Sequence, residues 1–151
     1  MRNKILTIAL SSLLLVACET TDSQNVNVGQ AAAPGTPEDF KQQIKDRVFF
    51  GYDKSAVSDD AKKTLETQAG WLKTYANTHA TVEGKTDVRV TREYNLALGE
   101  RRANAAKKAL EGFGIDAARL KTISYGKDHL EVVGNTEEAH AQNRTAITVI
   151  N

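Results

Sequence analysis

Between residues 47 and 151, β-prone segments alternate with segments of helical periodicity. Four short runs rich in β-branched and aromatic residues are predicted as strands, at residues 47–52, 80–84, 121–125 and 146–151. Apolar residues recur at helical spacing in the intervening segments 58–77, 91–112 and 136–143. This βαβαβ(α)β order predicts a small α/β sandwich in which the helices pack on one mixed four-stranded sheet.

The two long helical segments carry recognisable start and stop signals. Ser58 precedes two aspartates, which is typical of an N-cap and an acidic first turn. Thr91 takes the same place in the second segment, and Gly112 and Gly114 end it. Their spacing predicts inward-facing stripes at Ala61, Leu65, Ala69, Leu72 and Ala76, and at Tyr94, Leu98, Ala105, Ala109 and Phe113. We also expect Trp71 in the core.

The first seventeen residues have the pattern of a targeting segment. Two basic residues precede an apolar run from Ile5 to Val16, which is shorter than the about 18 residues that a membrane-spanning helix needs. The run ends just before Cys18, the single cysteine of the chain, and resembles the lipobox of bacterial lipoproteins. The resemblance implies a cleaved signal peptide at 1–17, a lipidated Cys18 and, because Glu19 is not Asp, placement in the outer membrane. An incidental thiol is the alternative.

Residues 18–37 are interpreted as the lipidated cysteine and a flexible linker, and residues 38–151 as one domain. The stretch 19–37 contains no Leu, Ile, Met or aromatic residue, so it cannot bury enough apolar surface to offset the entropy of ordering. The chain has 20 basic and 19 acidic residues, and removal of 1–17 takes two basic ones, which leaves a net charge of −1. This balance argues against nucleic acid as a partner.

One acidic and one basic residue could form a receptor for a zwitterion. Asp87 follows a predicted strand, and Arg102 lies on the next predicted helix. Arg binds a carboxylate through two parallel N–H···O bonds, and Asp accepts from an ammonium group. The simpler alternative is a surface ion pair of little energetic consequence, and the residue types alone favour it.

The segment 91–104, Thr-Arg-Glu-Tyr-Asn-Leu-Ala-Leu-Gly-Glu-Arg-Arg-Ala-Asn, resembles the signature of OmpA-like peptidoglycan-binding domains. More narrowly, it is similar to the peptidoglycan-associated lipoproteins of the Tol–Pal system. Matching segments at 49–55, 114–116, 119–120, 123–127 and 143–144 extend the similarity over residues 47–150. The resemblance implies an OmpA-like fold and a non-catalytic periplasmic domain that binds the diaminopimelate of the peptidoglycan stem peptide. Such a protein tethers the outer membrane to the cell wall.

The same resemblance implies roles for single residues. Asp87 would receive the ammonium group and Arg102 the carboxylate of the diaminopimelate side chain. The residues implied to line or support the pocket are Asp53, Thr86, Asn95, Leu98, Asn143 and Arg144. The periplasmic β-propeller protein TolB would dock on an overlapping face through Glu100 and Arg102, with other Tol-system proteins as further partners. The resemblance implies no cofactor and no metal.

Five positions depart from the family pattern: Lys85, Val88, Val90, Leu130 and Thr145. Val90 stands in place of a glycine, so a left-handed backbone there would be strained for a β-branched residue. Lys85 could pair with Asp87 and compete with the ligand's ammonium group, and Thr145 removes a cation from the site. An alternative function follows, in which the same fold has a weakened or disabled pocket and acts only as a partner of TolB.

A hydrolase is the competing class of function. The three histidines, His79, His129 and His140, have no i, i+4 neighbour among themselves, so the sequence contains no helical metal pair. A Gly-x-Ser-x-Gly motif is absent, and lipidation would consume Cys18. Acidic residues are plentiful, but no pair stands out for glycan cleavage. We therefore expect a binding protein and no enzyme.

Overall fold

The computed structural model describes residues 31–151, so the predictions for the signal peptide, for Cys18 and for most of the linker lie outside the described residues. In chain order the elements are α1 (Pro37–Gln43), β1 (Arg47–Phe49), α2 (Asp59–Thr74), β2 (Ala80–Lys85), α3 (Arg92–Gly112), a 3-10 turn (Ala117–Arg119), β3 (Leu120–Gly126), α4 (Glu137–Asn143) and β4 (Thr145–Ile150). Among the helices of residues 31–151, none combines the length and the hydropathy that a membrane span requires.

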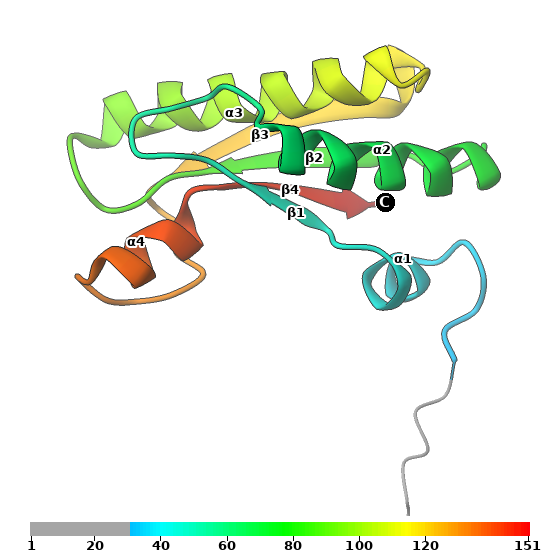
Figure 1. Cartoon of the computed structure of the whole chain (residues 1–151), viewed down its shortest axis with the longest axis horizontal. Coiled ribbons are helices and arrows are strands. Elements are labelled where there is room, and N and C mark those ends of the chain that lie inside the picture. The colour runs from blue at the N-terminus through cyan, green and yellow to red at the C-terminus, as the bar shows by residue number, and fades with distance from the viewer. Residues whose placement is uncertain (1–30) are drawn as a thin grey trace, which may run out of the picture. The chain divides into compact units, whose positions relative to one another are not determined.

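The strands form one mixed sheet in the order β1-β4-β2-β3. β2 and β3 are parallel, whereas β4 runs antiparallel to both β1 and β2. Figure 1 shows α2 and α3 over one face of this sheet, and α3 connects the two parallel strands across that face. The predicted mixed four-stranded α/β sandwich is therefore confirmed, with β1 ending three residues earlier than its predicted strand.

Helix α2 follows its sequence signals closely. The Ser58 side chain accepts a hydrogen bond from the backbone N–H of Ala61, as an N-cap should. The stripe is buried through Leu72, and Trp71 lies in the core as predicted. Ala76 falls beyond the helix, which ends at Thr74. A residue from outside the helix caps its C-terminal end. The Arg119 guanidinium donates to the carbonyls of Leu72, Tyr75 and Thr78.

Helix α3 has its predicted cap at Thr91 but buries a different stripe from the predicted one. The buried residues are Asn95, Leu98, Gly99, Arg102, Ala103, Ala106 and Leu110. The prediction was wrong for Tyr94, which is exposed, and for Ala105, Ala109 and Phe113, which are only partly buried. Apolar spacing misplaced the stripe because two of its buried members are polar and satisfy their groups by hydrogen bonds.

Helix α1 was not predicted and begins inside the segment interpreted as linker. Thr36 caps it, and the buried Phe40 packs edge-on against Trp71 with ring centroids 4.9 Å apart. The Asp39 carboxylate accepts from the Trp71 indole N–H at 3.1 Å and from the backbone N–H of Gly35 at 3.0 Å. A helix this short depends on such tertiary contacts, which apolar periodicity does not reveal.

Candidate binding site

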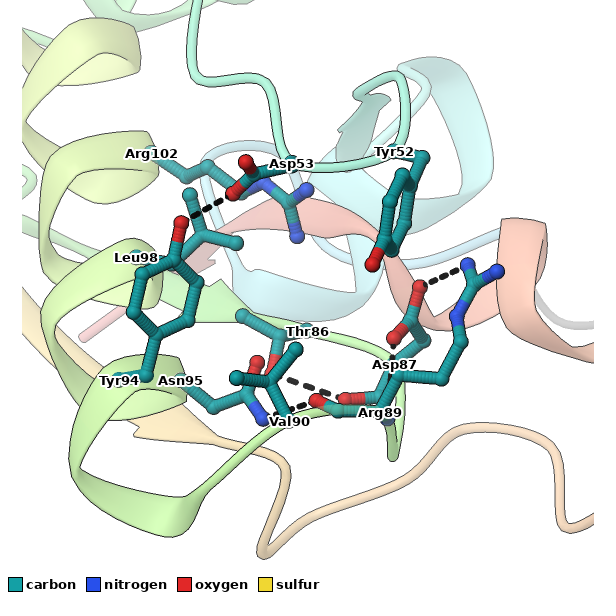
Figure 2. Close-up of a pocket in the computed structure, with 10 residues that line it drawn as sticks. All are labelled: Tyr52, Asp53, Thr86, Asp87, Arg89, Val90, Tyr94, Asn95, Leu98 and Arg102. Atoms are coloured by element: carbon teal, nitrogen blue, oxygen red, sulfur yellow. Dashed lines mark hydrogen bonds and ion pairs between the residues drawn. The ribbon is translucent and has the colours of Figure 1, made fainter.

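A cavity of about 250 Å³ lies where β2 passes into α3. Its walls come from the loop after β1, the loop after β2 and the first turns of α3 (Figure 2). The residues that line it are Tyr52, Asp53, Thr86, Asp87, Arg89, Val90, Tyr94, Asn95, Leu98 and Arg102. Six of these, namely Asp53, Thr86, Asp87, Asn95, Leu98 and Arg102, were site residues in the sequence-based prediction.

Two glycines bring the walls of this cavity together. Gly84 of β2 and Gly99 of α3 lie in backbone contact, and a Cβ added at Gly84 would stand 1.8 Å from the Gly99 carbonyl oxygen. A Cβ at Gly99 would meet the hydroxyl of Ser124 at 2.3 Å. This close approach seats α3 directly on the end of β2. It thereby sets the spacing between the loop that carries Asp87 and the helix that carries Arg102.

Arg102 is fully buried, and backbone atoms satisfy part of its guanidinium. Its Nε donates to the Lys54 carbonyl at 2.8 Å, and its two terminal nitrogens donate to the carbonyls of Lys85 at 2.9 Å and Gly51 at 3.1 Å. Within residues 31–151 no carboxylate forms an ion pair with it. Burial lowers the pKa of Arg102 to about 10. The cavity is therefore bordered by a cation that lacks an anionic partner.

Asp87 is also buried, but its charge is compensated. Its carboxylate accepts from the side chain and from the backbone N–H of Arg89, and it lies 3.6 Å from a terminal nitrogen of Arg144. Burial alone would raise the pKa of Asp87, but the hydrogen bonds and charge of Arg89 hold that pKa below its usual value. Asp87 and Arg102 thus share one cavity without pairing, and the alternative of a surface ion pair between them is wrong.

The depressed pKa of Asp87 predicts a loss of stability in acid. Its ionised form stabilises the fold at pH values above the unfolded pKa, and this contribution is lost as pH falls through the lower folded pKa. We expect Asp87→Asn to lower the free energy of unfolding by about 2 kcal/mol at pH 7. The difference from the parent should shrink at pH 3, as measured by urea denaturation at both pH values.

Asp128→Asn is the matched control for this prediction, because Asp128 pairs with Arg92 on the surface. It should cost less than about 1 kcal/mol at either pH. Equal losses for Asp87→Asn at pH 7 and pH 3 would contradict the role given to the Asp87 carboxylate.

Arg89 is one of the four lining residues that were not predicted as site residues, together with Tyr52, Val90 and Tyr94. It lies two positions after Asp87, stacks over the ring of Tyr52 at 4.2 Å and reaches Glu137 at 3.3 Å. Figure 2 shows it turned toward Asp87 at the cavity wall. The sequence signal that could have identified Arg89 is its position two residues after Asp87, because a cation that close in sequence to a buried carboxylate can neutralise it.

A hydrogen bond between α3 and the loop after β1 also lies at the wall of the cavity. The Tyr94 hydroxyl donates to the carboxylate of Asp53, and this bond raises the pKa of Tyr94. Asp53 has a positive φ of 53° in the loop after β1. Tyr94, placed in the core by the sequence analysis, instead belongs to this wall (Figure 2).

Asn143 and Arg144 support the site without lining it. The Asn143 amide accepts from the backbone N–H groups of Glu131 and Val132 and donates to the Val132 carbonyl, which fixes the loop before α4. Arg144 donates to the Phe50 carbonyl at 3.0 Å and pairs with Glu137 at 2.8 Å. Of the two, only Arg144 reaches a lining carboxylate, that of Asp87.

The departures from the family pattern have different outcomes. Val90 does adopt a left-handed backbone, with φ of 70°. The expected pairing of Lys85 with Asp87 is wrong, because the Lys85 ammonium lies 2.5 Å from Glu131 and 3.8 Å from Glu83. Strand alternation places Lys85 with Glu83 on the sheet face opposite α3. Thr145 is fully buried, and its hydroxyl has no hydrogen-bond partner among residues 31–151.

The arrangement is suited to binding a small zwitterionic group. Three segments of the chain bring charged groups to the walls of this cavity. They are the Arg102 guanidinium, which has no carboxylate partner within residues 31–151, and the carboxylates of Asp53 and Asp87. Across residues 31–151, no cluster of three or more His, Cys, Asp or Glu side chains could hold a metal ion.

Comparison with known proteins identifies the family. The OmpA family matches residues 49–144. The peptidoglycan-associated lipoprotein of Brucella melitensis is 40% identical over 156 aligned residues, which cover 99% of this chain and 93% of that protein. The chain belongs to the peptidoglycan-associated lipoproteins of the OmpA family.

Further relatives agree with this assignment. The peptidoglycan-associated lipoprotein of Haemophilus influenzae is 38% identical and covers 95% of both chains. Among solved structures, that of the peptidoglycan-associated lipoprotein from Burkholderia pseudomallei matches with a TM-score of 0.69 and 38% identity. It covers 71% of this chain and 91% of the other. The family resemblance expected from residues 47–150 is therefore confirmed.

Proposed function

We propose that the protein binds peptidoglycan non-covalently, through the zwitterionic end of the diaminopimelate side chain in the stem peptide. The observation that carries the proposal is the buried guanidinium of Arg102, which borders the cavity, donates to three backbone carbonyls and, within residues 31–151, forms no ion pair with a carboxylate. A buried charge without a counter-charge costs folding free energy, and an entering ligand carboxylate reduces that cost. The names of the relatives, which are peptidoglycan-associated lipoproteins, support peptidoglycan as the binding partner.

The ammonium group of the ligand is assigned to the acidic side of the cavity. Asp87 and Asp53 supply carboxylates from two different loops, and both line the cavity. In this structure the Arg89 guanidinium pairs with the Asp87 carboxylate. We infer that the ammonium group of the ligand either shares this carboxylate with Arg89 or displaces the guanidinium from it. Glu137, which Arg89 already touches, can keep the displaced guanidinium paired.

A pair of peptides that differ by one carboxylate tests this proposal. A stem peptide that ends in diaminopimelate should bind the full-length protein in detergent, as measured by isothermal titration calorimetry. The same peptide with lysine in its place lacks the side-chain carboxylate and should bind at least about tenfold more weakly, because a charge-assisted hydrogen bond contributes about 1.5–3 kcal/mol. Equal affinity for the two peptides would contradict the role of Arg102.

We further propose the cellular setting that the family implies. The chain is an outer-membrane lipoprotein anchored through Cys18, its domain is periplasmic, and it works with TolB and other Tol-system proteins. Of the two residues expected to contact TolB, Glu100 is exposed, whereas Arg102 is fully buried. We therefore propose Glu100 as a contact on the surface, whereas Arg102 can be reached only through the cavity. The proposed role is binding, without catalysis.

A second candidate function is a protein-interaction role with a disabled pocket. Two observations favour it, namely the ion pair of Arg89 with Asp87 and the left-handed backbone of Val90 at the cavity wall. This alternative predicts that neither stem peptide binds while TolB binding persists. The calorimetric comparison of the two peptides, followed by a TolB titration, separates the two functions.

A further inference from the structure

The loop from Asp87 to Thr91 carries an internal strain. It connects β2 to α3 and supplies three cavity residues, Asp87, Arg89 and Val90. Val90 has φ of 70°, a conformation that β-branched residues rarely adopt, and its side chain is half exposed. Packing of that side chain therefore cannot account for the conformation. Such backbone persists only where surrounding contacts hold it.

Two side chains hold the backbone carbonyls from Val88 to Thr91. The Lys127 ammonium donates to the carbonyl of Val90 at 2.7 Å and to that of Val88 at 3.3 Å. The Asn95 amide donates to the carbonyls of Arg89 at 2.6 Å and Thr91 at 3.0 Å. Four successive carbonyls of the loop are thus held, two by each side chain.

The backbone next to Lys127 is packed closely against α3. It follows Gly126, where a Cβ would stand 2.9 Å from the backbone nitrogen of Leu96, so β3 and α3 are in backbone contact there. The Gly126 carbonyl accepts from the backbone N–H of Thr86 at 2.8 Å. The base of the loop and the base of Lys127 are therefore fixed to each other.

We propose that Lys127 is a positioning residue for the cavity, which holds the loop from Asp87 to Thr91 in its left-handed turn at Val90. Lys127 does not line the cavity, so it acts on a ligand through the placement of Asp87 and Arg89. Among residues 31–151 its ammonium forms no ion pair, and the two loop carbonyls are its acceptors. The inference rests on the proposed function for the identity of the ligand.

A double-mutant cycle on the full-length protein tests the inference. Lys127→Met should weaken binding of the diaminopimelate stem peptide about tenfold, because two hydrogen bonds to the loop are lost. Hydrogen–deuterium exchange of the amides at 88–91 should become faster. In a Val90→Gly background the affinity loss should fall to less than about threefold, because glycine adopts positive φ without strain.

Two further variants make the cycle specific. Lys127→Arg keeps two donors and should retain parental affinity. Lys121→Met removes an exposed lysine from β3, the strand that precedes Lys127, and should change neither affinity nor exchange at 88–91.

Each contrary outcome overturns the inference in a distinguishable way. Unchanged exchange at 88–91 in Lys127→Met would show that Lys127 does not hold the loop. Equal affinity losses with valine and with glycine at position 90 would show that it does not act through the Val90 turn. If the parent bound no stem peptide, the proposed function would fail, whereas the exchange comparison would still decide the role of Lys127.

Discussion

Replacing Arg102 by methionine should weaken binding of the diaminopimelate stem peptide at least about 30-fold, because removing one partner of a buried charged pair costs about 2–5 kcal/mol. The variant should also be less stable by about 2–3 kcal/mol, since three backbone carbonyls lose their donor. Calorimetry at a temperature where the variant remains folded measures the first effect. Urea denaturation measures the second.

Arg119→Met is the matched control for this substitution. Arg119 also donates to three backbone carbonyls, at the end of α2, and it does not line the cavity. It should lose a similar amount of stability and keep parental affinity. If the two variants bound the peptide equally well, Arg102 would be a structural residue only, and the carboxylate would have to bind elsewhere.

Among substitutions of a described glycine by alanine, Gly84→Ala should cause the largest loss of stability. The new Cβ would stand 1.8 Å from the carbonyl oxygen of Gly99, and that atom belongs to the backbone of α3. The helix would have to move off the sheet. We therefore expect the free energy of unfolding to fall by about 3 kcal/mol or more, at the upper end of overpacking effects. Thermal and urea unfolding followed by circular dichroism measure it.

Gly70→Ala gives the comparison that isolates the close approach. Gly70 lies in α2, and a Cβ there would meet no atom within 4 Å. Alanine should stabilise that helix by about 0.5–1 kcal/mol, from helix propensity. A Gly84→Ala protein as stable as the parent would show that the contact between β2 and α3 can relax, and that the two glycines do not set the width of the cavity.

The sequence predicts the elements that carry their own signals. Helix α2 could be placed from Ser58 and its apolar stripe, because both are local features. The stripe of α3 could not, because two of its buried residues, Asn95 and Arg102, are polar, and the hydrogen-bond partners of Arg102 lie far along the chain. Helix α1 depends on packing of Phe40 against Trp71, which only the folded chain brings together.

The residues that belong to the site could be predicted better than the contacts that these residues make with one another. The resemblance to the OmpA-like domains placed Asp87 and Arg102 in one pocket, and both line the cavity. It could not show that Arg89 neutralises Asp87, because that contact depends on the conformation of the loop that carries both residues. Lys85 was assigned to the wrong partner because its strand position directs it to the opposite sheet face, toward Glu131.

Co-sedimentation of the full-length protein, in detergent, with purified sacculi of the diaminopimelate type tests whether the protein binds peptidoglycan through this cavity. We expect the protein to pellet with the sacculi and free diaminopimelate to release it in a concentration-dependent way. A folded protein that stays in the supernatant, or that pellets equally in saturating diaminopimelate, would contradict binding through this cavity.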